Sequence, residues 1–90
     1  MNQSKLEEYL QKQLIAQRDE INANMHKGDP IQYAETFQEN GIKTEMQKEI
    51  QHHVDKLYEA NMIEDKEKMR EYSADILNCV LFYMINRKLL

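Results

Sequence analysis

The chain has 90 residues, of which 41% are hydrophobic and 31% charged, a composition typical of one folded domain and not of a disordered chain. Its net charge of −4 at neutral pH provides no basic surface for nucleic acid or an anionic membrane. The single cysteine excludes an intramolecular disulfide, which is typical of a reducing compartment. No segment reaches the ~18 apolar residues of a spanning helix, and the N-terminus has no apolar export signal, so we expect a cytoplasmic protein.

Few residues in the chain interrupt a helix. Pro30 is the only proline, and Gly28 and Gly41 are the only glycines. Valine and threonine, which favour strands, occur twice each, whereas Gln, Glu, Lys, Leu and Met are abundant. The sequence therefore predicts an all-α fold, with residues 1–90 forming a single domain.

The first predicted helix covers roughly residues 5–27. It begins with a capping box, in which Ser4 caps the helix and Glu7 bonds back to Ser4. Gly28 follows as a residue suited to the left-handed position after a helix. Apolar residues that recur every three to four positions predict one buried face: Leu6, Leu10, Leu14, Ile21 and Met25.

The polar face of this first helix is rich in amide side chains. They are Gln3, Gln11, Gln13, Gln17, Asn22 and Asn24. Amides cost less to desolvate than charged groups, so this face is suited to packing on a partner. A purely solvated face is the alternative, and the sequence leaves both open.

A short second helix is predicted for roughly residues 30–40. The pair Asp29-Pro30 provides a capping side chain followed by the residue best suited to the first helical position. We expect the helix to end at Gly41 in the left-handed conformation. That stop would bring Phe37 and Ile42 into the hydrophobic contact that usually accompanies it.

The third and fourth helices are predicted for roughly residues 45–60 and 66–88. Thr44 and the glutamine three residues later form a second capping box, and Asn61 is a plausible left-handed stop. Asp65 can cap the fourth helix. Three long helices and one short crossover helix predict a small four-helix antiparallel bundle.

The fourth helix contains a continuous apolar run over residues 79–85. A helix that is hydrophobic all round must be buried all round. Its far side could be covered within a monomeric bundle, by another protein, or by a second copy, and we favour a homodimer because a small core gains from association. Asn78 and Asn86 bracket the run, which argues against a membrane tail. The predicted interface is Tyr72, Ile76, Val80, Leu81, Phe82, Tyr83, Met84 and Ile85.

Candidate chemical groups are few. Glu49 and His52 have the Glu-x-x-His spacing of di-iron bundles, but the second such motif that those sites need does not occur in the sequence. We expect one of His52 and His53 to be half-buried and the other solvated. Cys79 lies among apolar neighbours, so it is interpreted as a packing residue and not as a nucleophile. The sequence predicts no catalytic residue, metal site or cofactor.

The sequence thus predicts a small non-catalytic protein–protein interaction module, acting as a homodimer on an unidentified protein as a regulator, inhibitor or assembly accessory. The alternative is a DNA-binding regulator that uses the turn between the helices at 45–60 and 66–88 as a helix-turn-helix. Acidic residues around Lys66 make that surface poorly suited to phosphate contact. A composition rich in Asn, Lys, Ile and Glu is typical of an AT-rich bacterium or its phage.

Overall fold

The structure is a computed structural model that describes the backbone of residues 2–36 and 39–90 and the side chains of 2–36 and 46–90. These described residues form four α-helices and one 3-10 turn, with no strand, so the predicted all-α fold is confirmed. The elements are α1 (Gln3–Ala23), η1 (Met25–Lys27), α2 (Pro30–Thr36), α3 (Glu39–Met62) and α4 (Lys66–Asn86).

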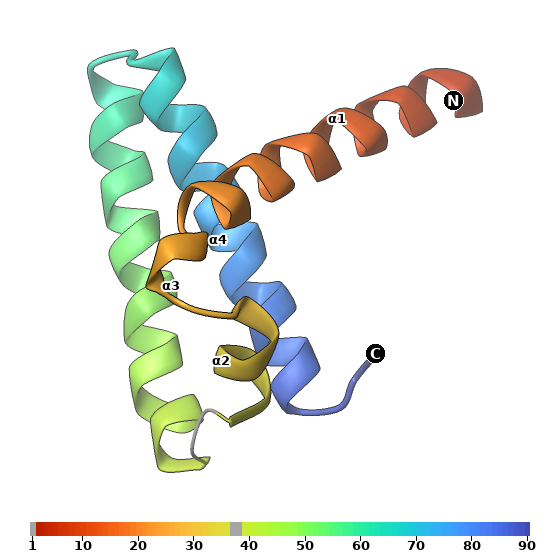
Figure 1. Cartoon of the computed structure of the whole chain (residues 1–90). Helices are drawn as coiled ribbons and strands as arrows, with labels where there is room; N and C mark the ends of the chain where they lie inside the picture. The colour runs from red at the N-terminus through yellow and green to blue at the C-terminus, as the bar shows by residue number, and fades with distance from the viewer. Residues whose placement is uncertain (1, 37–38) are drawn as a thin grey trace.

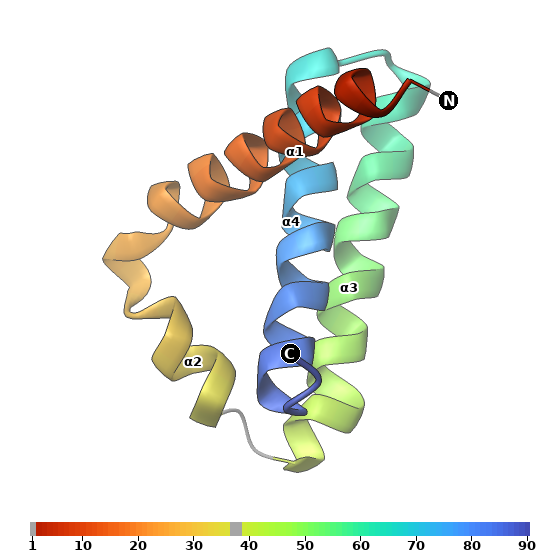
Figure 2. The same cartoon turned by 90° about the vertical axis from the view of Figure 1, so that its right-hand side faces the viewer.

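The helices α3 and α4 form a long hairpin, in which the two helices run side by side in opposite directions (Figures 1 and 2). Asp65 caps α4 as predicted, because its side-chain oxygen accepts a hydrogen bond of 3.1 Å from the backbone N–H of Lys68. The predicted stop at Asn61 is wrong. The left-handed residue is Glu64, with φ of 56°, and this turn lets the N–H of Asp65 donate to the carbonyl of Ala60 at 3.0 Å.

Helix α1 begins earlier than the sequence predicts. Asn2 is the N-cap, since its side-chain oxygen accepts a hydrogen bond of 3.1 Å from the backbone N–H of Lys5. Ser4, the predicted cap, lies inside the first turn. Asparagine caps a helix as well as serine does. Asn2 can therefore act as the N-cap, and the helix starts before Ser4.

The residues after α1 form a linker and do not continue the helix. α1 ends at Ala23, and the single turn η1 follows before Gly28, whose φ of 130° is accessible to glycine and strained for other residues. The predicted helix over residues 5–27 is therefore too long at this end. Asn24 is the C-cap residue that follows α1, and its side-chain amide donates a hydrogen bond of 2.9 Å to the carbonyl of Glu20.

Helix α2 starts as predicted, with Asp29 accepting 2.9 Å from the backbone N–H of Ile31 and Pro30 in the first position. The predicted stop at Gly41 is wrong, because Gly41 lies inside α3. One glycine costs a helix about 1 kcal/mol, which α3 offsets by packing on α4. Thr44 likewise lies inside α3, so it is not at the start of the helix as predicted. The expected contact between Phe37 and Ile42 lies outside the described residues.

Helix α4 is the centre of the fold, since α1, α2 and α3 all pack against it (Figures 1 and 2). Among the residues with described side chains, the buried hydrophobic ones are Ala34, Met46, Ala60 and Ala74. Three of these four are alanines, so the helices approach closely but remove little apolar area from water. The core is therefore thin for a domain of this length.

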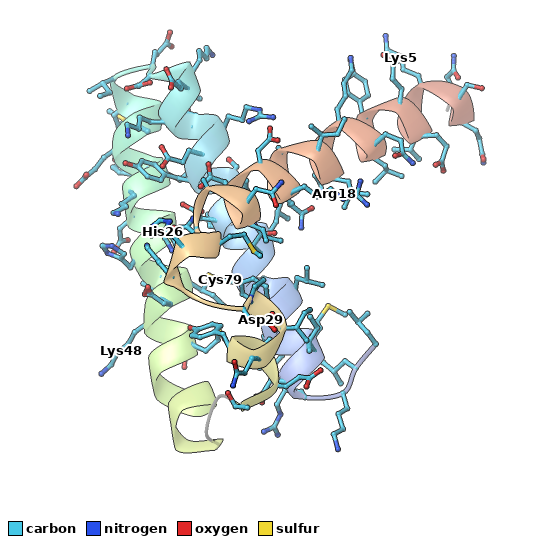
Figure 3. All side chains as sticks on the ribbon, in the orientation of Figure 1. Lys5, Arg18, His26, Asp29, Lys48 and Cys79 are labelled. Carbon is cyan, nitrogen blue, oxygen red and sulfur yellow. The ribbon has the colours of Figure 1, made fainter. Side chains whose placement is uncertain are left out.

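Helix α1 crosses α4, and its N-terminal part projects away from the other helices (Figures 1 and 2). In Figure 3, Lys5 marks the projecting end of α1. An antiparallel four-helix bundle is therefore not confirmed, although α3 and α4 pair in the expected way. Within the described part of the chain, no helix has the length and hydrophobicity that crossing a bilayer requires.

Candidate functional site

The predicted interface residues of α4 divide into two groups. Val80 and Tyr83 are exposed, with 41% and 39% of their surface accessible. The other six are half-buried: Tyr72, Ile76, Leu81, Phe82, Met84 and Ile85. Phe82 packs edge-on against Tyr33 of α2, with ring centroids 6.0 Å apart. Helices of the same chain thus cover much of α4, and Val80 and Tyr83 remain accessible to a partner.

A row of exposed leucines lies on α1. We call Leu6, Leu10 and Leu14 the α1 stripe; they are 40%, 46% and 38% exposed. Residues 2–15 are all exposed, so the described part of the chain leaves this stripe uncovered. The sequence predicts that these leucines lie on a buried face, together with Ile21 and Met25. Within one chain that prediction is wrong for the three leucines and for Met25, which are exposed. The sequence could not show that the helix carrying the stripe projects from the fold.

The C-terminal third of α1 is attached to α4 by polar side chains. Asn78, which is 5% exposed, donates 3.0 Å to the backbone carbonyl of Gln17 and accepts 3.2 Å from the side-chain amide of Gln17. About two turns earlier on α4, Arg70 donates a hydrogen bond of 3.1 Å to the carboxylate of Asp19. A pair of this kind at the surface contributes little on its own, so the buried Asn78 is the stronger contact.

Three carboxylates meet beside this contact. We call Glu20 of α1 and Glu71 and Asp75 of α4 the carboxylate cluster; each offers an oxygen within 4.8 Å of the others. Burial, and then the charge of Asp75, raise the pKa of Glu20 to about 7. Burial also raises the pKa of Asp75. Ionising Glu20 and Asp75 together is therefore unfavourable in this cluster.

The side chain of His53 adjoins the carboxylate cluster. Its Nδ1 atom is buried without a hydrogen-bond partner and lies 3.7 Å from an oxygen of Asp75, which is too far for a hydrogen bond. His52 is exposed, so the prediction of one half-buried and one solvated histidine is confirmed. Glu49 is also exposed, and Glu49 and His52 do not join the cluster. Carboxylates and imidazole are common metal ligands, but their proximity alone does not identify a metal site, and we assign none.

A cleft of about 710 Å³ lies between α1, η1 and α2 on one side and α3 and α4 on the other. Its lining includes the carboxylate cluster, Tyr33, Phe82 and Cys79. Cys79, labelled in Figure 3, is half-buried, and burial raises the pKa of its thiol to about 11. The thiol therefore stays protonated at neutral pH, the opposite of what a nucleophilic cysteine needs.

No protein-family model, curated protein or solved structure matches this chain.

Proposed function

We propose that the protein is a non-catalytic protein–protein interaction module that acts as a helical homodimer. The observation that carries this proposal is the α1 stripe, a row of leucines on a helix whose residues 2–15 are all exposed. Leucines on one helical face at this spacing are the usual seam between two helices. The thin core adds support, because a small domain that buries little within one chain gains from association.

The free energy gained by burying the stripe leucines, compared with the cost of association, indicates how large the homodimer seam must be. Burying a fully exposed leucine contributes about 2 kcal/mol, so residues that are 38–46% exposed contribute roughly 0.8 kcal/mol each. The six leucines of two α1 stripes then contribute about 5 kcal/mol, close to the lower limit of the cost of association. The proposed seam therefore also includes Val80 and Tyr83 of α4, the exposed members of the interface expected from the sequence.

The homodimer would act on another protein as a regulator, inhibitor or assembly accessory. Exposed amides on α1, including Gln3, Gln11 and Gln13, support this part of the proposal because they pack on a partner at a low desolvation cost. The DNA-binding alternative gains no support from the hairpin. Its helices run side by side, whereas the helices of a helix-turn-helix cross at about 90–120°.

Light scattering of the purified protein tests the homodimer. We expect a mass of twice 10.8 kDa for the native chain at tens of micromolar. Leu10→Glu places a charge in the middle of the proposed seam and should give the monomeric mass with the hairpin still folded, because Leu10 is exposed within one chain. The matched control is Gln11→Glu, which adds the same charge to the same helix outside the stripe and should leave the mass unchanged. A monomeric native chain, or a dimeric Leu10→Glu variant, would contradict the proposal.

A further inference from the structure

The attachment of α1 to the rest of the fold is narrow. Its half-buried residues are Ala16, Gln17, Glu20 and Ile21, and residues 2–15 before them are exposed. Two of the four are polar and contact α4, through Asn78 and through the carboxylate cluster. An attachment of this kind contains little apolar area, so its strength depends on charges and hydrogen bonds.

The linker after α1 leaves the helix able to change its direction. The α-helical hydrogen bonds end at Asn24, and η1 is closed only by short bonds from Lys27 to Asn24 at 3.0 Å and from Gly28 to Met25 at 3.1 Å. A single 3-10 turn is a common place for a hinge. Gly28, with φ of 130°, separates this turn from the cap of α2.

The carboxylate cluster lies across this attachment, with Glu20 on α1 facing Glu71 and Asp75 on α4. Carboxylates this close disfavour the ionised state of one another, so a proton is retained among them. When that proton is on Glu20, its carboxyl group donates a hydrogen bond to Asp75. The same pair of residues therefore attracts when it shares a proton and repels when it has lost it.

The other charged and titratable groups around Glu20 and Asp75 come from three helices. They are Asp19 on α1, His53 and Lys56 on α3, and Lys68 and Arg70 on α4. Two of the three cations have partners outside the cluster: Arg70 bonds to Asp19 at 3.1 Å, and Lys56 lies over the ring of Tyr72. Lys68 pairs with Glu71 of the cluster at 3.3 Å. They therefore offset only part of the repulsion within the cluster.

We propose that protonation of the carboxylate cluster controls the docking of α1 on α4: the protonated cluster holds α1 in place, and the fully ionised cluster lets α1 swing away about the linker at η1 and Gly28. The docked state binds the proton more tightly than the undocked state, because the pKa of Glu20 is raised in the docked state. Docking is therefore strongest below the ordinary pKa of a glutamate and weakens as the pH rises towards about 7. This device acts within one chain and does not depend on the proposed homodimer.

NMR of the full chain between pH 4 and 8 tests the proposal. The side-chain carboxyl carbon of Glu20 reports its ionisation, and the side-chain amide of Asn78 reports docking, because it donates to Gln17 only when α1 is docked. We expect the docking equilibrium constant to fall at least about tenfold over this range, the effect of one pKa unit. Measurements in the Leu10→Glu background separate docking from association.

Three variants identify the responsible group. Glu20→Gln keeps a hydrogen-bond donor to Asp75 without ionising, so docking should become independent of pH, and Asp75→Asn should remove most of the dependence as well. Glu8→Gln is the matched control, since Glu8 is exposed on the same helix and pairs only with Lys12 in the described structure, and it should behave like the native chain. Titration of Glu20 near 4.5, or a native Asn78 signal that does not respond to pH, would overturn the proposal. So would a pH dependence that survives Glu20→Gln and disappears in His53→Gln.

Discussion

At the scale of single residues, Asn78 is the side chain that joins α4 to α1. It is the buried polar residue among the described side chains, directly before the apolar run of α4, and both of its hydrogen bonds go to Gln17. A buried amide is tolerated only when its hydrogen bonds are satisfied. Asn78 therefore fixes where α1 crosses α4, which apolar neighbours alone would leave undetermined.

Replacing Asn78 should weaken the fold by a measurable amount. Asn78→Ala removes two hydrogen bonds from a buried position, and we expect the free energy of unfolding to fall by about 1–2 kcal/mol. Urea denaturation measures this change. Gln11→Ala is the control, because Gln11 is an exposed amide on α1, and its effect should stay within about 0.5 kcal/mol. If the two substitutions had equal effects, Asn78 would not be the residue that positions α1.

At the scale of the helices, the sequence correctly predicts the caps of α2 and α4, which depend only on neighbouring residues. Asp29 and Asp65 cap α2 and α4 because a short carboxylate before a helix reaches the unpaired N–H groups wherever the chain later packs. Gly41 failed as a stop because the packing of α3 on α4 outweighs the weak preference of one glycine.

The candidate sites were predicted less well than the caps of α2 and α4. The sequence contains Glu20, Glu71 and Asp75 as ordinary surface acids, and only the crossing of α1 over α4 brings them within 4.8 Å. Their spacing along the chain gives no signal of that meeting. The leucines of the α1 stripe were recognised, but whether they are covered depends on the direction of α1, which follows from Asn78 and the linker at Gly28.

The exposed part of α4 gives a test at this scale. Tyr83→Glu should dissociate the proposed homodimer, since it places a charge in the seam, while leaving the monomer folded because Tyr83 is 39% exposed. Light scattering and thermal unfolding measure the two effects. Tyr58→Glu makes the same change on α3, where Tyr58 is 66% exposed, and should alter neither the mass nor the melting temperature. An unchanged mass for Tyr83→Glu would place Tyr83 outside the seam.

At the scale of the whole molecule, few large apolar side chains are buried in the core and many remain exposed around it. Met46 is the one large side chain below 2% exposure among the described residues, whereas sixteen large hydrophobic residues are at least partly open to solvent. Small domains bury a modest share of their surface even when well packed. We expect a second copy of the chain to cover part of the exposed apolar surface and so to add stability that the small core does not provide.

This origin of stability predicts a melting temperature that depends on protein concentration. For a dimer of two 90-residue chains, a tenfold increase in concentration should raise the melting temperature by about 4 °C. Differential scanning calorimetry over two decades of concentration measures the trend. The Leu10→Glu variant should melt at one temperature throughout. A native chain whose melting temperature did not move with concentration would be stable on its own.

The exposure of residues 2–15 also concerns the helix itself. A helical segment of this length is only marginally stable in water when it packs against nothing, because the cost of starting a helix is recovered over too few residues. We therefore expect the first half of α1 to exchange between helix and coil until another surface covers its leucines. Recognition and helix formation become a single event in this segment, and the amount of helix in the chain becomes a direct measure of how much of it is bound.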